Sequence, residues 1–478
     1  MPCPPRPACR LATLAVLLSA AALPGLARET LPTEVQSALQ RARVPQEAIA
    51  VSIHEVGSGR TVLVHRAQAA MNPASLAKLM TTAAALDLLG PAWTWSTPVW
   101  LLGSLRDGVL EGSVHIKGTG DPKLVVERVW LLLRRVQQLG VREIRGDIVL
   151  DGTAFAASEG GSADFDGESL RPYNVRPDAL LLNYKSVVYT FVPDPARAVA
   201  AVAAEPLLSG VGVDRTVPLA GGPCDDWRAN LKASFAEARV RFAGAYPTSC
   251  GEQSWPLADA QPSTYNARLI DGLWREMGGR LSGVVRDGPA PSDTRPSFEM
   301  RSPPLLEVVR EINKFSNNVM AQQLFLSLAL VRGTAGAPAS SASAREVLRR
   351  WLAARLGDLP PEVVIDNGSG LSREGRVSAQ WLDRLLMSAF DSAWMPELMS
   401  SLPIAGIDGT LRRSRATAGR AHLKSGSLRD VAGIAGYVLS DSGRRYVLVA
   451  MINHPQAGAA RPALDALLQW TLRDAPPH

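Results

Sequence analysis

The stretch ASLAKLMTTAAALDLL, residues 74–89, pairs Ser75 with Lys78 and then continues with apolar residues at helical spacing. Positions i and i+3 share one face of a helix, so the serine hydroxyl and the lysine amine can come within hydrogen-bonding distance. A serine hydroxyl is a weak nucleophile unless a base removes its proton, and a lysine is a base only when it is neutral. Burial and a second cation nearby would have to lower the pKa of Lys78 from about 10.4 toward 7. The stretch therefore predicts a helix that begins with a nucleophile and its base; a plain helix start with an exposed serine is the alternative.

The sequence around this stretch predicts five strands and several helices, divided between the two ends of the chain. Two of the strands flank Gly57-Ser58-Gly59, whose turn chemistry joins them in a hairpin. Such a set favours an α+β domain, a five-stranded antiparallel sheet covered by helices, to which both chain ends contribute. The expected strands are residues 49–54, 61–65, 422–424, 434–439 and 445–453, and further helices are expected over residues 31–42, 305–329, 344–356 and 460–473.

The middle of the chain, residues 93–302, has a different sequence pattern. It contains short strand candidates, one helix at residues 124–139 and many glycine and proline breaks. We interpret it as smaller, mostly-β domains inserted into a domain composed of residues 28–92 and 303–478.

Two further short motifs each occur once. Ser316-Asn317-Asn318 offers a hydroxyl that can relay a proton and an amide that can hold a substrate carbonyl. Lys424-Ser425-Gly426 lies on a strand candidate, and its lysine is the second cation that would lower the pKa of Lys78. Its serine can donate to a carboxylate, and its glycine lets a backbone approach closely. The alternatives are a polar helix start for the first motif and a turn-forming Ser-Gly for the second.

In this order the three motifs resemble the signature S-x-x-K, S-x-N, K-[ST]-G of the penicillin-recognising serine enzymes. Ser75 and Ser316 are 241 positions apart (316 minus 75), so extra domains must lie between them. The sequence is therefore most similar to the class C low-molecular-weight penicillin-binding proteins, the D-alanyl-D-alanine carboxypeptidase/endopeptidase family. The resemblance implies a transpeptidase-like domain interrupted by a second domain, with a third nested in it at about residues 156–262. Similar segments also occur at residues 118–122, 366–373 and 401–410.

This resemblance implies an exported serine enzyme that hydrolyses D-Ala-D-Ala ends and cross-links of peptidoglycan peptides through an acyl-serine, without a cofactor. Ser75 would attack, Lys78 would be the base and Ser316 would relay the proton to the leaving amine. Asn318 would orient the peptide, and Lys424 with Ser425 would bind its terminal carboxylate. β-Lactams would acylate the nucleophile because they mimic the dipeptide.

The resemblance implies further contacts around these residues. Gly426 lies within the K-[ST]-G motif, and the backbone N–H groups of Ser75 and Ser427 are the expected oxyanion hole. Because Ser425 stands where the family usually has threonine, we expect a looser grip on the carboxylate. Asp151 is expected to face an amine of the stem peptide and Arg373 a carboxylate. The alternative is that Asp151 starts a turn at the end of a strand and that Arg373 forms a surface ion pair.

Two alternative functions are also compatible with the sequence. A serine β-lactamase or esterase of the same fold would need fast deacylation, and a non-catalytic peptidoglycan-binding protein would not need all three motifs. The chain has no G-x-S-x-G elbow of the α/β-hydrolases. The sequence leaves open the balance of carboxypeptidase and endopeptidase activity, and a homodimer.

The first 27 residues carry Arg6 and Arg10, an apolar stretch and a small-x-small end at Gly25-Leu26-Ala27. They predict a signal peptide and a periplasmic protein, with a buried first helix as the alternative. Of the four cysteines Cys224 and Cys250 remain after cleavage, and an oxidising compartment favours a disulfide between them over two unpaired thiols. No other apolar run reaches the length of about 18 residues that a membrane anchor needs.

The composition excludes several classes of protein. With 478 residues, 46% hydrophobic and 20% charged, the chain can bury sizeable cores and is neither disordered nor fibrous. A net charge of +6 spread over this length is not the footprint of a nucleic-acid-binding protein. The six histidines show no metal-binding spacing, so we expect no metal site.

Overall fold

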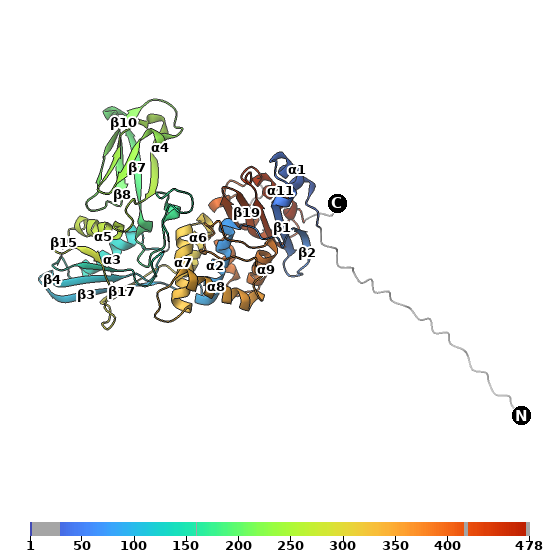
Figure 1. Cartoon of the computed structure of the whole chain (residues 1–478), viewed down its shortest axis with the longest axis horizontal. Helices are drawn as coiled ribbons and strands as arrows, with labels where there is room; N and C mark the ends of the chain where they lie inside the picture. Colours follow the sequence, from blue (N-terminus) through green and yellow to red (C-terminus); the bar gives the residue numbers. More distant parts are fainter. Residues whose placement is uncertain (2–28, 159, 415–418, 475–478) are drawn as a thin grey trace.

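The computed structural model describes residues 1, 29–158, 160–414 and 419–474. The chain near residue 29 and the chain near residue 474 lie in one body, and residues from the middle of the sequence form two further bodies beside it (Figure 1). The predicted signal peptide lies, except for Met1, outside the described residues. Within the described ranges, no helix combines the length and apolar character needed to cross a bilayer.

A five-stranded antiparallel sheet unites the two ends of the chain, as the sequence predicts. Its central pairing joins β1 to β20, with Val51 opposite Ala450, although these residues are far apart in sequence. Most of β19 and β20 is buried, because helices cover both faces of the sheet. The strand order is β18 (Ala421–Leu428), β19 (Val431–Leu439), β20 (Arg445–Asn453), β1 (Ile49–Glu55) and β2 (Thr61–His65).

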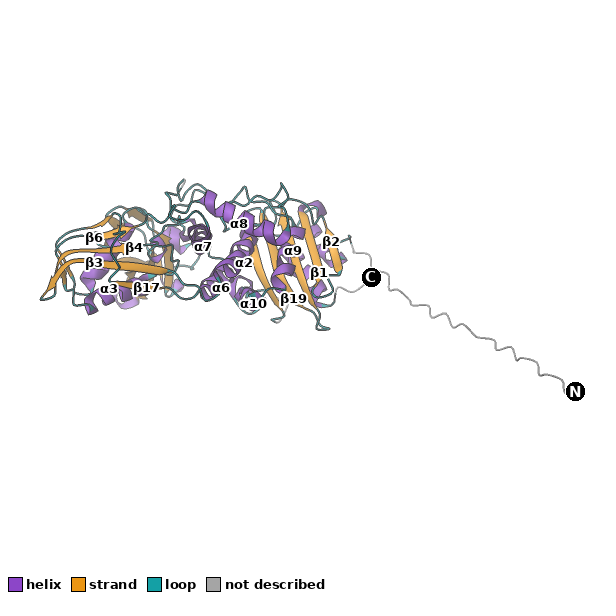
Figure 2. Cartoon of the chain, turned by 90° about the horizontal axis from the view of Figure 1, so that it is seen from below, coloured by secondary structure: helices purple, strands orange, loops and turns teal. Residues whose placement is uncertain are grey.

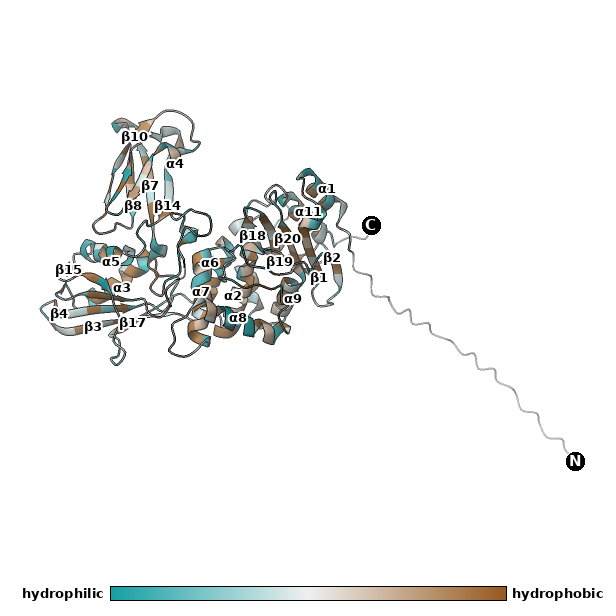
Figure 3. Cartoon of the chain, viewed as in Figure 1, coloured by the Kyte–Doolittle hydropathy of each residue, from teal (hydrophilic) through white to brown (hydrophobic). Residues whose placement is uncertain are grey.

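Two helical layers enclose this sheet. The terminal helices α1 (Thr33–Arg41) and α11 (Arg461–Leu472) pack on each other and on one face, with a core that includes Val35, Leu448 and Leu467. The other face packs against a larger helical layer (Figure 2). Hydrophobic colouring runs along the strands of this sheet and through the adjoining helices (Figure 3). The helices of the larger layer are α2 (Lys78–Leu89), α6 (Leu305–Phe315), α7 (Asn318–Arg332), α8 (Ser341–Leu356), α9 (Ala379–Phe390) and α10 (Met395–Ser401).

Helix α2 lies at the centre of the helical layer. Each residue from Lys78 to Leu86 is buried, and α6, α7, α8 and α10 all contact the helix. Its alanines, at positions 83–85, let these neighbours approach closely because they carry no bulk beyond Cβ. A polar group at the start of α2 is therefore surrounded by protein on every side.

The expected single helix over residues 305–329 is wrong, because Ser316 divides it into α6 and α7. The φ angle of Ser316 is 57°, a left-handed conformation that cannot continue an α-helix. Asn317 then caps α7, and its side-chain oxygen accepts a hydrogen bond from the backbone N–H of Met320 at 3.0 Å. The bend places Ser316 and Asn318 on adjacent helix ends.

The first inserted body contains a seven-stranded sheet with α3 (Val126–Gln138) and α5 (Tyr265–Glu276) packed in its core. The strand that enters it, β3, pairs with the strand that leaves it, β17, so the insertion begins and ends side by side. The boundaries at residues 93 and 302 stay predictions. The strands are β3 (Ser96–Arg106), β4 (Val109–Lys117), β5 (Glu143–Ile144), β6 (Ile148–Asp151), β15 (Arg280–Leu281), β16 (Val285–Asp287) and β17 (Phe298–Arg301).

A second inserted body is nested inside the first, between β6 and α5. It has a five-stranded sheet and a small three-stranded one around aromatic residues such as Phe191 and Tyr246. The predicted disulfide is present here, between Cys224 and Cys250. The elements are β7 (Ser186–Asp194), β8 (Val199–Glu205), β9 (Gly212–Val213), β10 (Thr216–Ala220), α4 (Trp227–Asn230), β11 (Ala233–Ala236), β12 (Arg239–Phe242), β13 (Tyr246–Pro247) and β14 (Gln253–Ala258).

Candidate active site

Ser75 lies in a turn of 3-10 helix, Ala74–Ala77, that leads into α2. The turn begins with Ala74 at a φ of 46°, and the side chain of Asn72 accepts a hydrogen bond from its N–H at 2.8 Å. One helical turn later, the Nζ atom of Lys78 is 2.9 Å from the Oγ atom of Ser75. The structure thus brings together the hydroxyl and the amine as the S-x-x-K spacing predicts.

The amine of Lys78 has three hydrogen-bonding partners. Besides Ser75, it contacts the side-chain Oδ1 atom of Asn318 at 2.7 Å and the backbone oxygen of Ser369 at 2.6 Å. The latter two atoms only accept hydrogen bonds, so they take two N–H groups of the amine. A neutral amine then has its lone pair left for the hydroxyl of Ser75, as a general base requires.

Burial lowers the pKa of Lys78 well below that of an exposed lysine, and the charge of Lys424 lowers it further. Both causes act in the same direction because each disfavours the protonated amine. Burial also lowers the pKa of Lys424, to about 7. The second cation that the sequence required is therefore present, and no carboxylate contacts Lys78 to oppose the effect among the described residues.

The S-x-N and K-[ST]-G motifs meet beside Ser75. Lys424 on β18 reaches the Oγ atom of Ser316 with its Nζ atom at 2.9 Å and the backbone oxygen of Ser425 at 2.8 Å. Asn318, at the start of α7, contacts Lys78 as described above. Two lysines, each bonded to a residue of the S-x-N motif, therefore link all three motifs into one hydrogen-bonded group.

Gly426 allows β18 to run against the turn that carries Ser75. A Cβ atom at this position would lie 2.8 Å from the backbone oxygen of Pro73 and 3.1 Å from the Leu76 side chain. Ser427 follows on the same strand, and its Oγ atom accepts a hydrogen bond from Arg461 at 2.6 Å. The two expected oxyanion donors, the N–H groups of Ser75 and Ser427, thus belong to segments in direct contact.

A cleft of about 1060 Å³ opens above these motifs. Its lining includes Phe315, whose side chain is 70% exposed at the rim. Four arginines and two aspartates also line it, an excess of positive charge that suits an anionic substrate. Among the predicted residues it is lined by Ser75, Ser316, Asn318, Ser425, Gly426, Ser427 and Arg373, and the charged set is Arg373, Arg413, Arg429, Arg461, Asp166 and Asp465.

Asp151 does not line the cleft, so we do not propose it as a contact for the stem peptide. Its side chain is buried at the end of β6 and accepts hydrogen bonds from Thr153 and from the backbone N–H of Ala290. Lys117 lies 3.5 Å from it. The strand-end role given as the alternative describes this position, because the carboxylate holds together the loops that follow β6 and β16.

Arg373 does line the cleft and also makes a surface ion pair. Its guanidinium is 3.1 Å from Asp430 and lies over the ring of Phe165, with 4.6 Å to the ring centroid. One of the two aspartates that line the same cleft is Asp166, whose carboxylate accepts hydrogen bonds from Tyr173 and Asn174. No motif marks Asp166 in the sequence. It reaches the cleft because the part of the insertion that carries it folds back toward the catalytic domain.

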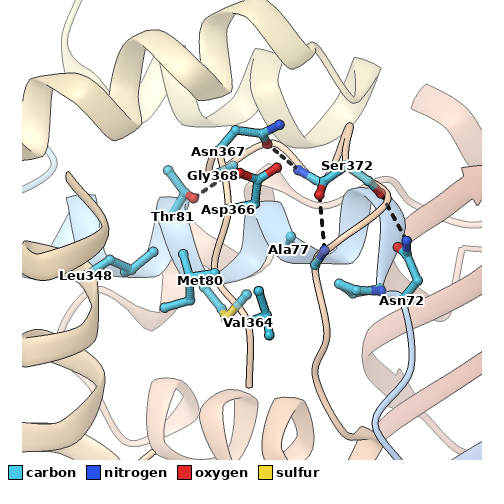
Figure 4. A pocket seen from close by; sticks show the side chains of 14 residues that line it. Asn72, Ala77, Met80, Thr81, Leu348, Val364, Asp366, Asn367, Gly368 and Ser372 are labelled. Carbon is cyan, nitrogen blue, oxygen red and sulfur yellow. Dashed lines mark hydrogen bonds between the residues drawn. The ribbon is translucent and has the colours of Figure 1, made fainter. Parts of the chain in front are cut away.

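Ser369 is a further functional residue that the sequence did not single out, although it lies in a segment noted for its family resemblance. The turn that carries it is built by Asn367, whose Oδ1 atom accepts from the backbone N–H of Ser369 and of Gly370. Figure 4 shows this turn beside α2, where Thr81 donates to the backbone oxygen of Gly368 at 2.7 Å. These bonds fix the carbonyl that accepts from Lys78.

Within the described ranges, no cluster of three or more histidine, cysteine or acidic side chains could hold a metal ion. The site described above brings together two hydroxyls, two amines and an amide, those of Ser75, Ser316, Lys78, Lys424 and Asn318. Together with the fold they define a serine-type peptidase with the transpeptidase-like domain of the penicillin-binding proteins.

Comparison with known proteins gives the family. Residues 31–473 match the D-Ala-D-Ala carboxypeptidase 3 (S13) family, and the chain belongs to this family. It is accordingly a serine-type D-Ala-D-Ala carboxypeptidase.

Similar proteins span most of the chain. A D-alanyl-D-alanine carboxypeptidase of an Actinomadura species is 26% identical over 431 residues, which cover 85% of this chain and 77% of the relative. The D-alanyl-D-alanine carboxypeptidase DacB of Haemophilus influenzae is 24% identical over 412 residues, covering 81% of each chain. The crystal structure of penicillin binding protein 4 from Haemophilus influenzae has the same fold, with a TM-score of 0.74 and 22% identity over 91% of this chain and 99% of that one.

Proposed function

We propose that this protein is a periplasmic enzyme that trims and cuts peptidoglycan peptides, acting as carboxypeptidase on D-Ala-D-Ala ends and as endopeptidase on cross-links. The observation that carries the proposal is the amine of Lys78, which is buried and bonded to Ser75, Asn318 and Ser369 at once. This arrangement supports a neutral lysine held against a nucleophilic hydroxyl.

The proposed acylation starts when the Oγ atom of Ser75 attacks the carbonyl carbon of the penultimate D-alanine and its proton passes to the lone pair of Lys78. The backbone N–H groups of Ser75 and Ser427 stabilise the negative charge that develops on the carbonyl oxygen. The C–N bond then breaks, and Ser316 gives its hydroxyl proton to the leaving amine. The proton lost by Ser316 is replaced through a water from the protonated amine of Lys78, whose own hydrogen bonds go to Ser75, Asn318 and Ser369. Water later hydrolyses the ester and regenerates Ser75.

The proposed carboxylate site is formed by Lys424 and Ser425. The charged amine of Lys424 supplies the counter-charge, and the hydroxyl of Ser425 donates a hydrogen bond. A carboxylate bound there also raises the pKa of Lys424 and so keeps this lysine charged in the complex. Chains that end in a free carboxylate are therefore the preferred substrates for the carboxypeptidase reaction.

Arg373 and Asp166 are the proposed contacts for the side chain of the stem peptide. They line the same cleft with opposite charges, and Phe165 lies below the guanidinium. A side chain that carries both an amine and a carboxylate matches this pair, with the amine toward Asp166 and the carboxylate toward Arg373. Asp166 replaces Asp151 in this role because Asp151 is buried away from the cleft.

Labelling with fluorescent penicillin tests the proposal. The wild-type protein should form a stable covalent adduct, and Ser75→Ala should form none because the nucleophile is gone. A matched control is Ser58→Ala, at an exposed serine of the first hairpin, which should label as wild type. An adduct that disappears within seconds would favour the β-lactamase alternative, and no adduct with the wild-type protein would contradict the proposed chemistry.

Purified muropeptides test the substrate. We expect release of D-alanine from pentapeptides and conversion of cross-linked dimers to monomers, and Ser75→Ala should lose both. Activity on only one of the two substrates would reduce the proposal to that reaction.

A further inference from the structure

The side chain of Thr410 touches the proposed carboxylate-binding serine. Its Oγ1 atom is 2.6 Å from the Oγ atom of Ser425, and both residues line the cleft. Resting on the function proposed above, we infer that Thr410 is a positioning residue that fixes the hydroxyl of Ser425 for the terminal carboxylate of the substrate.

Ser425 needs such a partner because it is a serine. A threonine has a γ-methyl group that restricts χ1, whereas a serine hydroxyl can occupy all three staggered positions. Ser425 is partly exposed on β18, so packing alone does not select one rotamer. A hydrogen bond from a fixed neighbour can make the selection that the methyl group makes in threonine.

The direction of this hydrogen bond follows from the chemistry of the substrate. A carboxylate only accepts hydrogen bonds, so Ser425 must give its single proton to the substrate. Its oxygen is then free to accept the proton of Thr410. The result is a chain from Thr410 through Ser425 to the carboxylate, in which each bond polarises and strengthens the next.

Thr410 is itself held from two sides. The loop before it is tied to α6, where the amine of Lys314 is 2.6 Å from the Oδ2 atom of Asp408 and the lysine side chain is only 4% exposed. The other oxygen of Asp408 accepts from the backbone N–H of Ile404 at 2.7 Å, and Ile404 forms a β-bridge with His422 on β18. The loop is therefore anchored to the two elements that carry Ser316 and Ser425.

Gly409 permits this close anchoring. Its φ angle is 56°, and a Cβ atom there would lie 2.5 Å from the backbone oxygen of Lys314. Only a glycine lets the loop lie against the end of α6 without displacing Thr410. The close approach at Gly409 thus helps to fix the backbone that carries Thr410.

The test compares Thr410→Val in two backgrounds, the natural Ser425 and Ser425→Thr. Valine keeps the shape of threonine and removes the hydroxyl. With a peptide that ends in D-Ala-D-Ala, we expect Thr410→Val to lower kcat/KM about 3- to 10-fold, mostly through a higher KM, because three rotamers become available to Ser425. In the Ser425→Thr background the same change should cost less than about twofold, since the added methyl group selects the rotamer.

Thr410→Ser, which keeps the hydroxyl, should stay close to wild type, and thermal unfolding should confirm that all variants are folded. An equal loss in both backgrounds would show that Thr410 acts in another way, by direct contact with substrate or by general damage, and would overturn the inference. No loss in the natural background would overturn it as well. If the wild-type protein released no D-alanine, the proposed function would fail first and this inference with it.

Discussion

At the scale of single residues, the environment of one amine decides the chemistry. Lys78 is fully buried, has two acceptors besides Ser75 and lies near a second cation. Desolvation and like-charge repulsion both favour the neutral form. Lys424 has the opposite requirement. It must be charged to bind a carboxylate, although burial lowers its pKa to about 7.

The opposite requirements of the two lysines predict the pH dependence. As pH falls, Lys78 gains a proton and the base is lost; as pH rises through about 7, Lys424 loses its proton and the carboxylate site is lost. A plot of kcat/KM against pH should therefore be bell-shaped, with its alkaline limb near pH 7. The alkaline limb of kcat should lie at higher pH, because bound carboxylate raises the pKa of Lys424.

Lys424→Arg checks the assignment of that limb, since an arginine stays charged throughout this range. The variant should lose the alkaline limb of kcat/KM and keep the acidic one. An unchanged alkaline limb in a folded Lys424→Arg protein would mean that another group titrates. The comparison of kcat with kcat/KM in the wild-type protein gives a second, independent reading.

At the scale of elements, the site depends on turns that regular helices cannot provide. Ser316 ends α6 in the left-handed region, and the segment from Asn367 to Gly370 turns sharply beside α2. Each turn presents one group to the lysines, the hydroxyl of Ser316 and the carbonyl of Ser369. The backbone conformation of these turns therefore matters as much as the side chains.

Gly370 provides a sharp test of this dependence. Its φ angle is 76°, and a Cβ atom would lie 1.8 Å from the backbone oxygen of Ala74, next to Ser75. Gly370→Ala should displace the turn or the nucleophile and lower the rate of acylation by penicillin about 100-fold or more, the scale expected for a misplaced reacting group.

Gly336 is a matched control, because its φ angle is also 76° and nothing lies within 4 Å of an added Cβ atom. Gly336→Ala should lose about 1 kcal/mol of stability through backbone strain alone and acylate at the wild-type rate. Acylation kinetics and thermal unfolding of both variants measure the difference. Wild-type acylation by Gly370→Ala would show that the close contact is not needed.

At the scale of the whole molecule, the sheets of the nested body do not line the cleft, whereas the segment before them contributes Phe165 and Asp166 to it. The catalytic sheet has a core on each face, where it packs against its two helical layers, and the insertions share a third core. The disulfide between Cys224 and Cys250 lies in the nested body, beside β10 and β13. It closes a loop in the unfolded chain between two residues whose sequence separation is 26, and it does not touch the cleft.

Replacement of both cysteines, Cys224→Ser with Cys250→Ser, should therefore lower the stability of the nested body by about 3 kcal/mol. Limited proteolysis should detect this loss as faster cleavage between residues 186 and 258. Turnover of a D-Ala-D-Ala peptide should remain within about twofold of wild type, the range expected for a change remote from the reacting groups. A large loss of turnover with unchanged proteolysis would contradict this prediction, because it would show that the disulfide affects the active site without touching the cleft.

The sequence by itself determined the reactive residue types and the domain that carries them. The S-x-x-K, S-x-N and K-[ST]-G motifs can be read because helical spacing and strand position place their side chains locally. The five strands can be read because their apolar runs are separated by clear turn residues. The disulfide was predicted because only Cys224 and Cys250 would remain after cleavage of the predicted signal peptide.

Only the tertiary structure decided which polar groups surround the nucleophile. The break at Ser316 was missed because the apolar periodicity continues through it, whereas the bend depends on a left-handed residue and the cap from Asn317. The sequence indicated Asp151 and did not indicate Asp166, since burial and cleft lining arise from contacts between segments distant in sequence. The carbonyl of Ser369 and the hydroxyl of Thr410 were not predicted for the same reason. Long-range packing, and not a local sequence pattern, brings the first to Lys78 and the second to Ser425.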